Sequence, residues 1–113
     1  MKPLRLAVFG LAMAFTAGIG ASAARASCYE NVGCSDRDYF STHDLYRLSC
    51  QNLDFLRNSI YAERGYCFKK YQYQQLFGNG NCRFETSGEV PLNRVERANV
   101  DAIVRVERNE GCR

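Results

Sequence analysis

Six cysteines in a chain of 113 residues constrain the fold more than any other feature of this sequence. The cysteines are Cys28, Cys34, Cys50, Cys67, Cys82 and Cys112. No C-x-x-C spacing occurs and His43 is the only histidine, so neither a zinc site nor a thioredoxin-like redox motif is expected. An even number of cysteines in so short a chain predicts three disulfides, which would stabilise a domain whose apolar core is small.

The first 26 residues have the pattern of a secretory signal peptide. Lys2 and Arg5 form a basic start, residues 6–24 are uncharged and apolar or small, and Ala24-Arg25-Ala26 fits the small-x-small cleavage rule. We therefore expect a signal peptide at 1–26, cleavage before Ser27, and a periplasmic or secreted protein. Such a compartment also suits disulfides.

Three alternatives to this processing remain. Cleavage after Ala21-Ser22-Ala23 satisfies the same rule. The uncharged run is about long enough to stay in the membrane as a helix. Ala26-Ser27-Cys28 suits a lipoprotein signal, except that Arg25 stands where an aliphatic residue belongs. After cleavage, no stable membrane insertion is expected.

Removing the signal changes the charge balance. The whole chain has 15 basic and 12 acidic residues, and Lys2, Arg5 and Arg25 would leave with the signal. The mature chain then holds 12 of each, so its formal charge is zero. A general attraction to nucleic acid loses its main support, and no nucleic-acid partner is expected.

Two principal helices are predicted in the mature chain. The first covers residues 50–64, with Ser49 as N-cap and Gly65 as terminator. The second begins after Asn93, which forms a capping-box pattern with Glu96, and is ended by Gly111. Their apolar stripes are Leu53, Leu56 and Ile60 in the first helix, and Val95, Ala98, Ala102, Ile103 and Val106 in the second.

The rest of the chain predicts shorter elements. Residues 27–45 form an irregular extension, with a helical turn near 44–48 for which Thr42 is the expected cap. Residues 70–77 form a short middle helix that stops at Gly78. The expected fold is therefore mainly α: one small disulfide-stabilised helical domain at 46–113, with two principal helices, a short middle helix and loops.

Two segments resemble the YARHG domain, a presumed extracellular bacterial module. They are Leu56–Phe68, which reads LRNSIYAERGYCF, and Leu92–Ile103, which reads LNRVERANVDAI. The name-giving motif would read Tyr-Ala-Arg-His-Gly, whereas here Glu63 and Arg64 occupy its third and fourth positions. Any role of the histidine is therefore lost, and the last four cysteines suggest a cysteine-rich variant. The resemblance implies a fold and an exported location rather than a reaction.

The disulfide pairing is one of 15 possible connectivities. We expect Cys50–Cys112, because antiparallel packing of the two principal helices places the start of one beside the end of the other. Cys67–Cys82 would flank the middle helix and fix it to the core. Cys28–Cys34 would close a short turn-rich loop.

Two groups of side chains are candidates for binding. Arg94, Arg97, Arg105 and Arg108 fall on one face of the last helix. Guanidinium groups in this arrangement suit an anionic glycan or a teichoic-type polymer. The alternative is an ordinary solvated face, since Asp101 stands four residues from Arg97 and from Arg105. Tyr71 and Tyr73 cannot share one helix face, so one of them should be exposed for stacking on a sugar or a partner protein.

Catalytic residues are harder to find. His43 lies near Ser41 and Ser49, but proximity in sequence is not a triad. Glu63 and Glu85 are the pair of acids that a small envelope-glycan hydrolase would use. The loop Asn79–Pro91 could instead act as the inhibitory segment of an inhibitor of an exported hydrolase.

Asn58 and Asn99 lie on or beside apolar stripes, where a polar side chain needs a partner. A structural hydrogen bond to a turn of the backbone is the expected role of each. No motif calls for a cofactor or a metal. The sequence therefore favours a non-catalytic binding module of the cell envelope or periplasm, with an envelope glycan or an exported protein as its partner.

Overall fold

The computed structural model describes residues 28–113 and is mainly α-helical, as predicted. The signal peptide and its cleavage site lie outside the described residues. The elements are β1 (Cys28–Tyr29), β2 (Gly33–Cys34), α2 (Thr42–Tyr46), α3 (Cys50–Glu63), α4 (Tyr71–Phe77), the 3-10 turn η2 (Ser87–Glu89) and α5 (Arg94–Asn109). None of the helices within 28–113 is long and apolar enough to cross a membrane.

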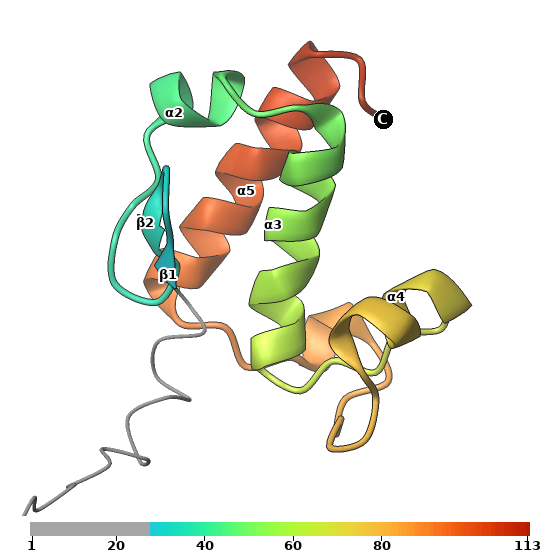
Figure 1. The fold of residues 1–113 in the computed structure, drawn as a ribbon. Helices are drawn as coiled ribbons and strands as arrows, with labels where there is room; N and C mark the ends of the chain where they lie inside the picture. Colours follow the sequence, from blue (N-terminus) through green and yellow to red (C-terminus); the bar gives the residue numbers. More distant parts are fainter. Residues whose placement is uncertain (1–27) are drawn as a thin grey trace, which may run out of the picture.

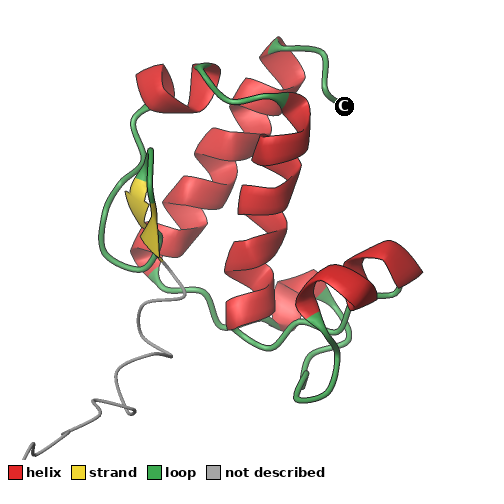
Figure 2. Ribbon diagram, viewed as in Figure 1, coloured by secondary structure: helices red, strands yellow, loops and turns green. Residues whose placement is uncertain are grey.

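The two long helices, α3 and α5, form the centre of the domain. They lie side by side and antiparallel, with α2 across one end and α4 projecting from the other (Figures 1 and 2). Leu53, Leu56 and Ile60 from α3 meet Ile103 and Val106 from α5 in the core, where each is at most 4% exposed. The two helices therefore pack through their apolar sides, as the periodicity predicts. Within α5, Val95 and Ala98 of the expected stripe are only half-buried, and Val100, which the stripe left out, is buried in the core.

Polar side chains at the helix starts fix where α3 and α5 begin. Ser49 accepts a hydrogen bond from the amide of Asn52 and caps α3, as expected. Asn93 and Glu96 form the expected capping box at α5. The cap of α2 was expected at Thr42, but it is Ser41, whose hydroxyl accepts from the amide of Asp44. Both residues can cap, so the sequence alone does not separate these adjacent registers.

The three disulfides pair as expected: Cys28–Cys34, Cys50–Cys112 and Cys67–Cys82. Cys50 begins α3 and Cys112 follows α5, so their bond joins two helix ends that the antiparallel packing brings together (Figure 1). All six cysteines are used. Disulfides of this kind persist in oxidising compartments outside the cytoplasm.

Residues 28–45, which we expected as an irregular extension, contain a small antiparallel hairpin and most of α2. In the hairpin, Cys28 pairs with Cys34 and Tyr29 with Gly33. Gly33 has φ of 106°, a conformation that a residue with a Cβ rarely adopts. Phe40 and Leu45 are buried in the common core with α3 and α5.

Aromatic rings hold α4 against α3. Phe68 is buried, and its ring centroid lies 5.0 Å from that of Phe77 and 5.6 Å from that of Tyr73. Phe77 also stacks on Phe55 of α3 at 5.5 Å. Phe77 itself is only half-buried. The reason is that α4 has no second layer above it, and none of its residues is buried.

Candidate functional site

Four arginines lie on the outer face of α5. Arg94, Arg97, Arg105 and Arg108 are all exposed, and their spacing keeps them on one side of the helix. We call these four residues the arginine face. They extend over roughly 20 Å at the rise of an α-helix. Arg97 Nε donates a hydrogen bond to the carbonyl of Leu92 at 3.2 Å. None of the four arginines forms an ion pair within the described residues.

The acids of α5 do not neutralise this face. Glu96 and Glu107 point inward and are 1% and 2% exposed. Asp101 is exposed among the arginines, but it forms no ion pair within the described residues. The outer side of α5 therefore carries four positive charges against one negative charge, although residues 28–113 as a whole have a formal charge of zero.

The inward acids are held by arginines from α3. Arg57 donates from Nε to Glu107 Oε1 at 2.8 Å and from Nη2 to Asp54 Oδ1 at 2.8 Å. Tyr73 of α4 donates its hydroxyl to the other oxygen of Asp54, also at 2.8 Å. This hydrogen bond raises the pKa of Tyr73. A connected series of hydrogen bonds and ion pairs thus joins α4, α3 and α5. The ring and the hydroxyl of Tyr73 both make contacts within the domain.

Tyr71 is the exposed member of the tyrosine pair, at 73%. It faces away from Tyr73, which agrees with the expectation that the two cannot share a helix face. The structure places these tyrosines on α4 and the arginines on α5, so the sequence-predicted candidates belong to two different elements.

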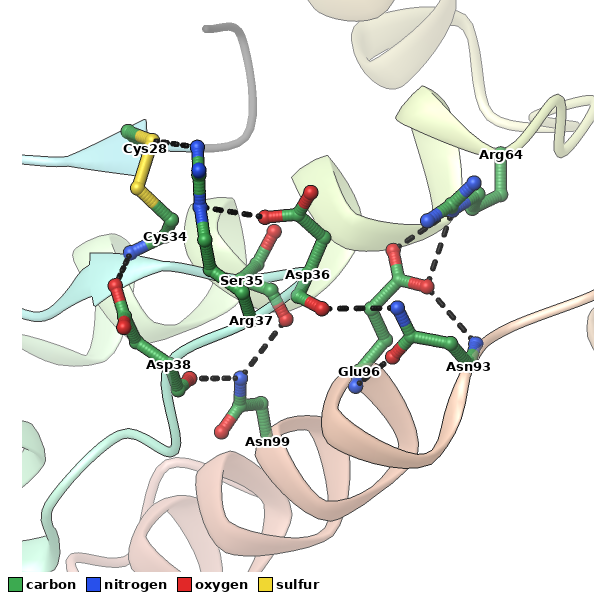
Figure 3. A network of polar contacts seen from close by, with 10 residues as sticks. All are labelled: Cys28, Cys34, Ser35, Asp36, Arg37, Asp38, Arg64, Asn93, Glu96 and Asn99. Atoms are coloured by element: carbon green, nitrogen blue, oxygen red, sulfur yellow. Dashed lines mark hydrogen bonds and ion pairs between the residues drawn. A yellow bond between two sulfur atoms is a disulfide. The ribbon is translucent and has the colours of Figure 1, made fainter. Parts of the chain in front are cut away.

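A second ion pair joins the end of α3 to the start of α5 (Figure 3). Arg64 Nε lies 3.0 Å from Oε1 and 2.8 Å from Oε2 of the buried Glu96 carboxylate. The same carboxylate accepts from the backbone amide of Asn93, and the Asn93 side chain donates to the carbonyl of Asp36. Sequence reasoning identified the capping box but not the arginine that completes it, because Arg64 and Glu96 are 32 residues apart.

Asn99 attaches the N-terminal segment to α5. Its amide nitrogen donates to the carbonyls of Ser35 and Asp38, at 3.0 and 2.9 Å (Figure 3). Its oxygen accepts from the amide of Phe40 at 2.8 Å. This is the structural role expected for it. Asn58 also bonds to backbone, but to its own helix, at the carbonyl of Asp54.

An open cleft lies between the end of α3 and the segment that follows α4. It has a volume of about 710 Å³ and is lined by Ala62, Glu63, Gly65, Tyr66, Phe77, Gly78, Gly80, Asn81, Cys82 and Arg83. We call it the Glu63 cleft. Its size falls in the range of small-molecule sites. The Cys67–Cys82 disulfide fixes one wall, and the amides of Arg83 and Phe84 fix another by donating to the carbonyl of Gly65 at 2.7 and 3.0 Å.

Glu63 is the titratable carboxyl group of this cleft. Desolvation raises its pKa to about 7, although a hydrogen bond from the hydroxyl of Tyr29, at 2.5 Å, acts in the opposite direction. The negative charge of Glu96 raises this pKa further, while Arg64 lowers it. Burial and the same hydrogen bond raise the pKa of Tyr29.

The second acid considered for catalysis does not share this cleft. Glu85 is exposed on the following loop and is absent from the cleft lining. His43 is exposed on α2, where no hydrogen bond within residues 28–113 joins it to Ser41 or Ser49. Across the same residues, no group of three or more His, Cys, Asp or Glu side chains could hold a metal ion.

Comparison with known proteins identifies the family. The model of the YARHG domain matches residues 25–108, which include the hairpin, the helical pair and the cleft. No curated protein gives a significant match, and neither does any solved structure. The match covers most of the chain and includes the two segments whose residues resemble this domain. The chain therefore belongs to the YARHG domain family.

Proposed function

We propose that this protein is an exported, non-catalytic binding module that holds an anionic polymer of the cell envelope on the arginine face. The observation that carries the proposal is the distribution of charge on α5. Its two inward acids are paired with Arg57 and Arg64, and Asp101 pairs with none of its neighbours among the described residues. Four guanidinium groups consequently remain available in one row.

Guanidinium groups suit this task because each offers a planar set of donors to phosphate or carboxylate oxygens. A row of roughly 20 Å can contact several successive anionic groups of a polymer. The helix beneath it is anchored at both ends, by the capping box at Asn93 and by the Cys50–Cys112 disulfide. The row is therefore presented on a rigid support, which reduces the entropy lost on binding.

The hydrolase alternative receives less support from the geometry. A glycosidase needs two carboxyl groups on either side of the scissile bond. The Glu63 cleft offers Glu63, but Glu85 does not line it. The loop considered for an inhibitor, Asn79–Pro91, is tied down at its start by the side chain of Asn79, which bonds the backbone of Phe68, and its end at Val90 is buried.

An equilibrium binding assay tests the proposal. The exported protein, with its disulfides intact, is titrated with a teichoic-acid polymer and with a neutral glycan of similar length. We expect saturable binding of the anionic polymer only. The pair Arg105→Gln/Arg108→Gln should weaken it roughly tenfold, as the loss of two exposed charge contacts implies.

The matched control is Lys69→Gln/Lys70→Gln, which removes the same charge from exposed residues beside α4. Its affinity should stay within about twofold of the wild-type affinity if the arginine face, rather than total charge, determines binding. Equal losses in the two double variants would mean that the attraction is unspecific. Turnover of the neutral glycan that is lost in Glu63→Gln would favour the hydrolase instead.

A further inference from the structure

The Glu63 cleft contains two charges of opposite sign that the domain leaves without an ionic partner. No ion pair of the described residues includes Glu63 or Arg83. This distinguishes them from Arg57 and Arg64, whose guanidinium groups bind buried carboxylates. Two such groups in the lining of one cleft are available to a ligand.

Each of the two charged groups is held in place by a contact that leaves part of it free. Tyr29 donates to Oε1 of Glu63, and Oε2 has no hydrogen-bond partner within residues 28–113. The guanidinium of Arg83 lies over the ring of Phe84, with its carbon 5.7 Å from the ring centroid. A Cβ placed on Gly65 would lie 3.6 Å from Arg83 Nε, so this guanidinium extends beside the turn that follows Glu63.

The remaining walls combine aromatic rings with exposed backbone. Tyr66 packs edge-on against Phe68 at 4.9 Å, and Phe77 stacks on Phe68 at 5.0 Å. Both rings that line the cleft are therefore held in position by the buried ring of Phe68. Gly78 and Gly80 present backbone with no side chain, and a Cβ added at either would meet nothing within 4 Å. Rings and bare peptide groups suit a ligand that has both apolar groups and amides.

We propose that the Glu63 cleft binds a short peptide with free ends, with its ammonium group at Glu63 and its carboxylate at Arg83. Its side chains would pack on Tyr66 and Phe77. A cleft of about 710 Å³ is large for a single amino acid and suits two or three residues. The site is separate from the arginine face, so either proposal can fail without the other.

The test uses the exported, oxidised protein labelled with ¹⁵N and titrated with the tripeptide Ala-Leu-Ala. Two blocked forms accompany it, one acetylated at the amino end and one amidated at the carboxyl end. We expect saturable shifts of the amides of Gly65, Gly78 and Gly80 with the free peptide. Each blocked form should bind at least about fivefold more weakly, because one of its two charges is gone.

Variants assign each charge to one end of the peptide. Glu63→Gln should abolish the preference for the free amino end and keep the preference for the free carboxylate, and Arg83→Gln should do the reverse. The controls Glu85→Gln and Arg47→Gln remove the same charges from exposed residues outside the cleft and should change neither preference. The comparison of blocked and free peptides on the wild type does not depend on how well any variant folds.

Three results would overturn the assignment. One is equal binding of the free and blocked peptides. The second is an unchanged preference in both Glu63→Gln and Arg83→Gln. The third is the absence of saturable shifts up to about 10 mM peptide, since a dissociation constant above this concentration is too weak for a specific site. Binding of a neutral trisaccharide at the same amides, without binding of the peptide, would assign the cleft to sugars instead.

Discussion

Arg64 and Glu96 join the end of α3 to the first turn of α5, with Arg64 Nε 2.8 Å from Oε2 of a carboxylate that is only 1% exposed. Because Glu96 also belongs to the capping box, this one contact stabilises the start of α5, joins the two helices and neutralises a buried charge. Arg64 is the fourth residue of the segment Tyr61–Gly65, the position at which the family motif carries histidine. In this chain that position therefore has a structural task.

Replacing Arg64 should destabilise the domain. In Arg64→Ala the carboxylate of Glu96 stays buried, and its remaining hydrogen-bond donor within residues 28–113 is the backbone amide of Asn93. We expect a loss of about 2 kcal/mol in the free energy of unfolding, below the range for fully buried pairs because Arg64 is 39% exposed. Urea unfolding of the oxidised protein measures it.

Arg94→Ala is the matched control, since Arg94 is exposed in the same part of the fold and has no ion-pair partner within residues 28–113. It should change stability by less than about 0.5 kcal/mol. If Arg64→Ala were as mild as this control, the pair would not hold the two helices together.

Asn99→Ala should be more damaging than its size suggests. The substitution removes three hydrogen bonds and leaves the amide of Phe40 and the carbonyl of Ser35 without their partner. We expect a loss of about 3 kcal/mol. Thermal unfolding followed by circular dichroism reports it, and hydrogen exchange should accelerate first at Phe40.

Ser35→Ala tests the same region in the opposite sense. The hydroxyl of Ser35 is buried and has no hydrogen-bond partner among residues 28–113, whereas its carbonyl accepts a hydrogen bond from the side chain of Asn99. Removing only the hydroxyl should leave stability unchanged or raise it by up to about 1 kcal/mol. A loss as large as that of Asn99→Ala would reveal a partner for this hydroxyl.

The sequence predicted the helical pair because long stripes and caps are local signals. Leu53, Leu56 and Ile60 mark the buried side of α3, and Asn93 with Glu96 marks the start of α5. Cys50–Cys112 then followed from antiparallel packing. These features depend on short-range periodicity and on one simple arrangement in space.

The polar network could not be predicted in the same way. Arg57–Glu107 and Arg64–Glu96 join residues 50 and 32 positions apart, and no local pattern distinguishes a buried acid from an exposed one. The arginine face was predicted as a row, but its charge excess depends on which acids turn inward. The Glu63 cleft depends on how the loop after α4 folds back on Gly65, so it required the structure.

Removing the disulfide that closes the longest loop should leave the fold only marginally stable. Cys50→Ala/Cys112→Ala opens a loop of 62 residues, which the chain-entropy model values at about 4 kcal/mol. The corresponding change at Cys28 and Cys34, six residues apart, should cost about 2 kcal/mol. Urea midpoints of the two double variants test the order, and the reverse order would contradict it.

The stability of the protein should respond to the titration of Glu63. The native pKa is about 7, above the ordinary value of 4.5, so between these values the folded protein binds more protons than the unfolded one. The contribution of Glu63 to stability is therefore present below about pH 4.5 and is lost as the pH rises to about 7.

The difference in unfolding free energy between wild type and Glu63→Gln isolates this effect. Wild type should lose stability relative to the variant across this window and change little above it. The groups around Glu63 that stay in both proteins are Tyr29, Asp36, Arg64 and Glu96. A difference that does not vary with pH would mean that Glu63 titrates at its ordinary pKa.

The salt dependence of polymer binding tests the central claim most directly. Affinity for a teichoic-acid polymer is measured at a series of salt concentrations, for the wild type and for a variant with all four arginines of the arginine face replaced by glutamine. If this face holds the polymer, wild-type affinity falls steeply as the salt concentration rises, because salt ions screen the attraction between the arginines and the phosphates. The variant should bind weakly, and its affinity should depend much less on the salt concentration. Equal slopes and equal affinities for the two proteins would contradict the proposed function.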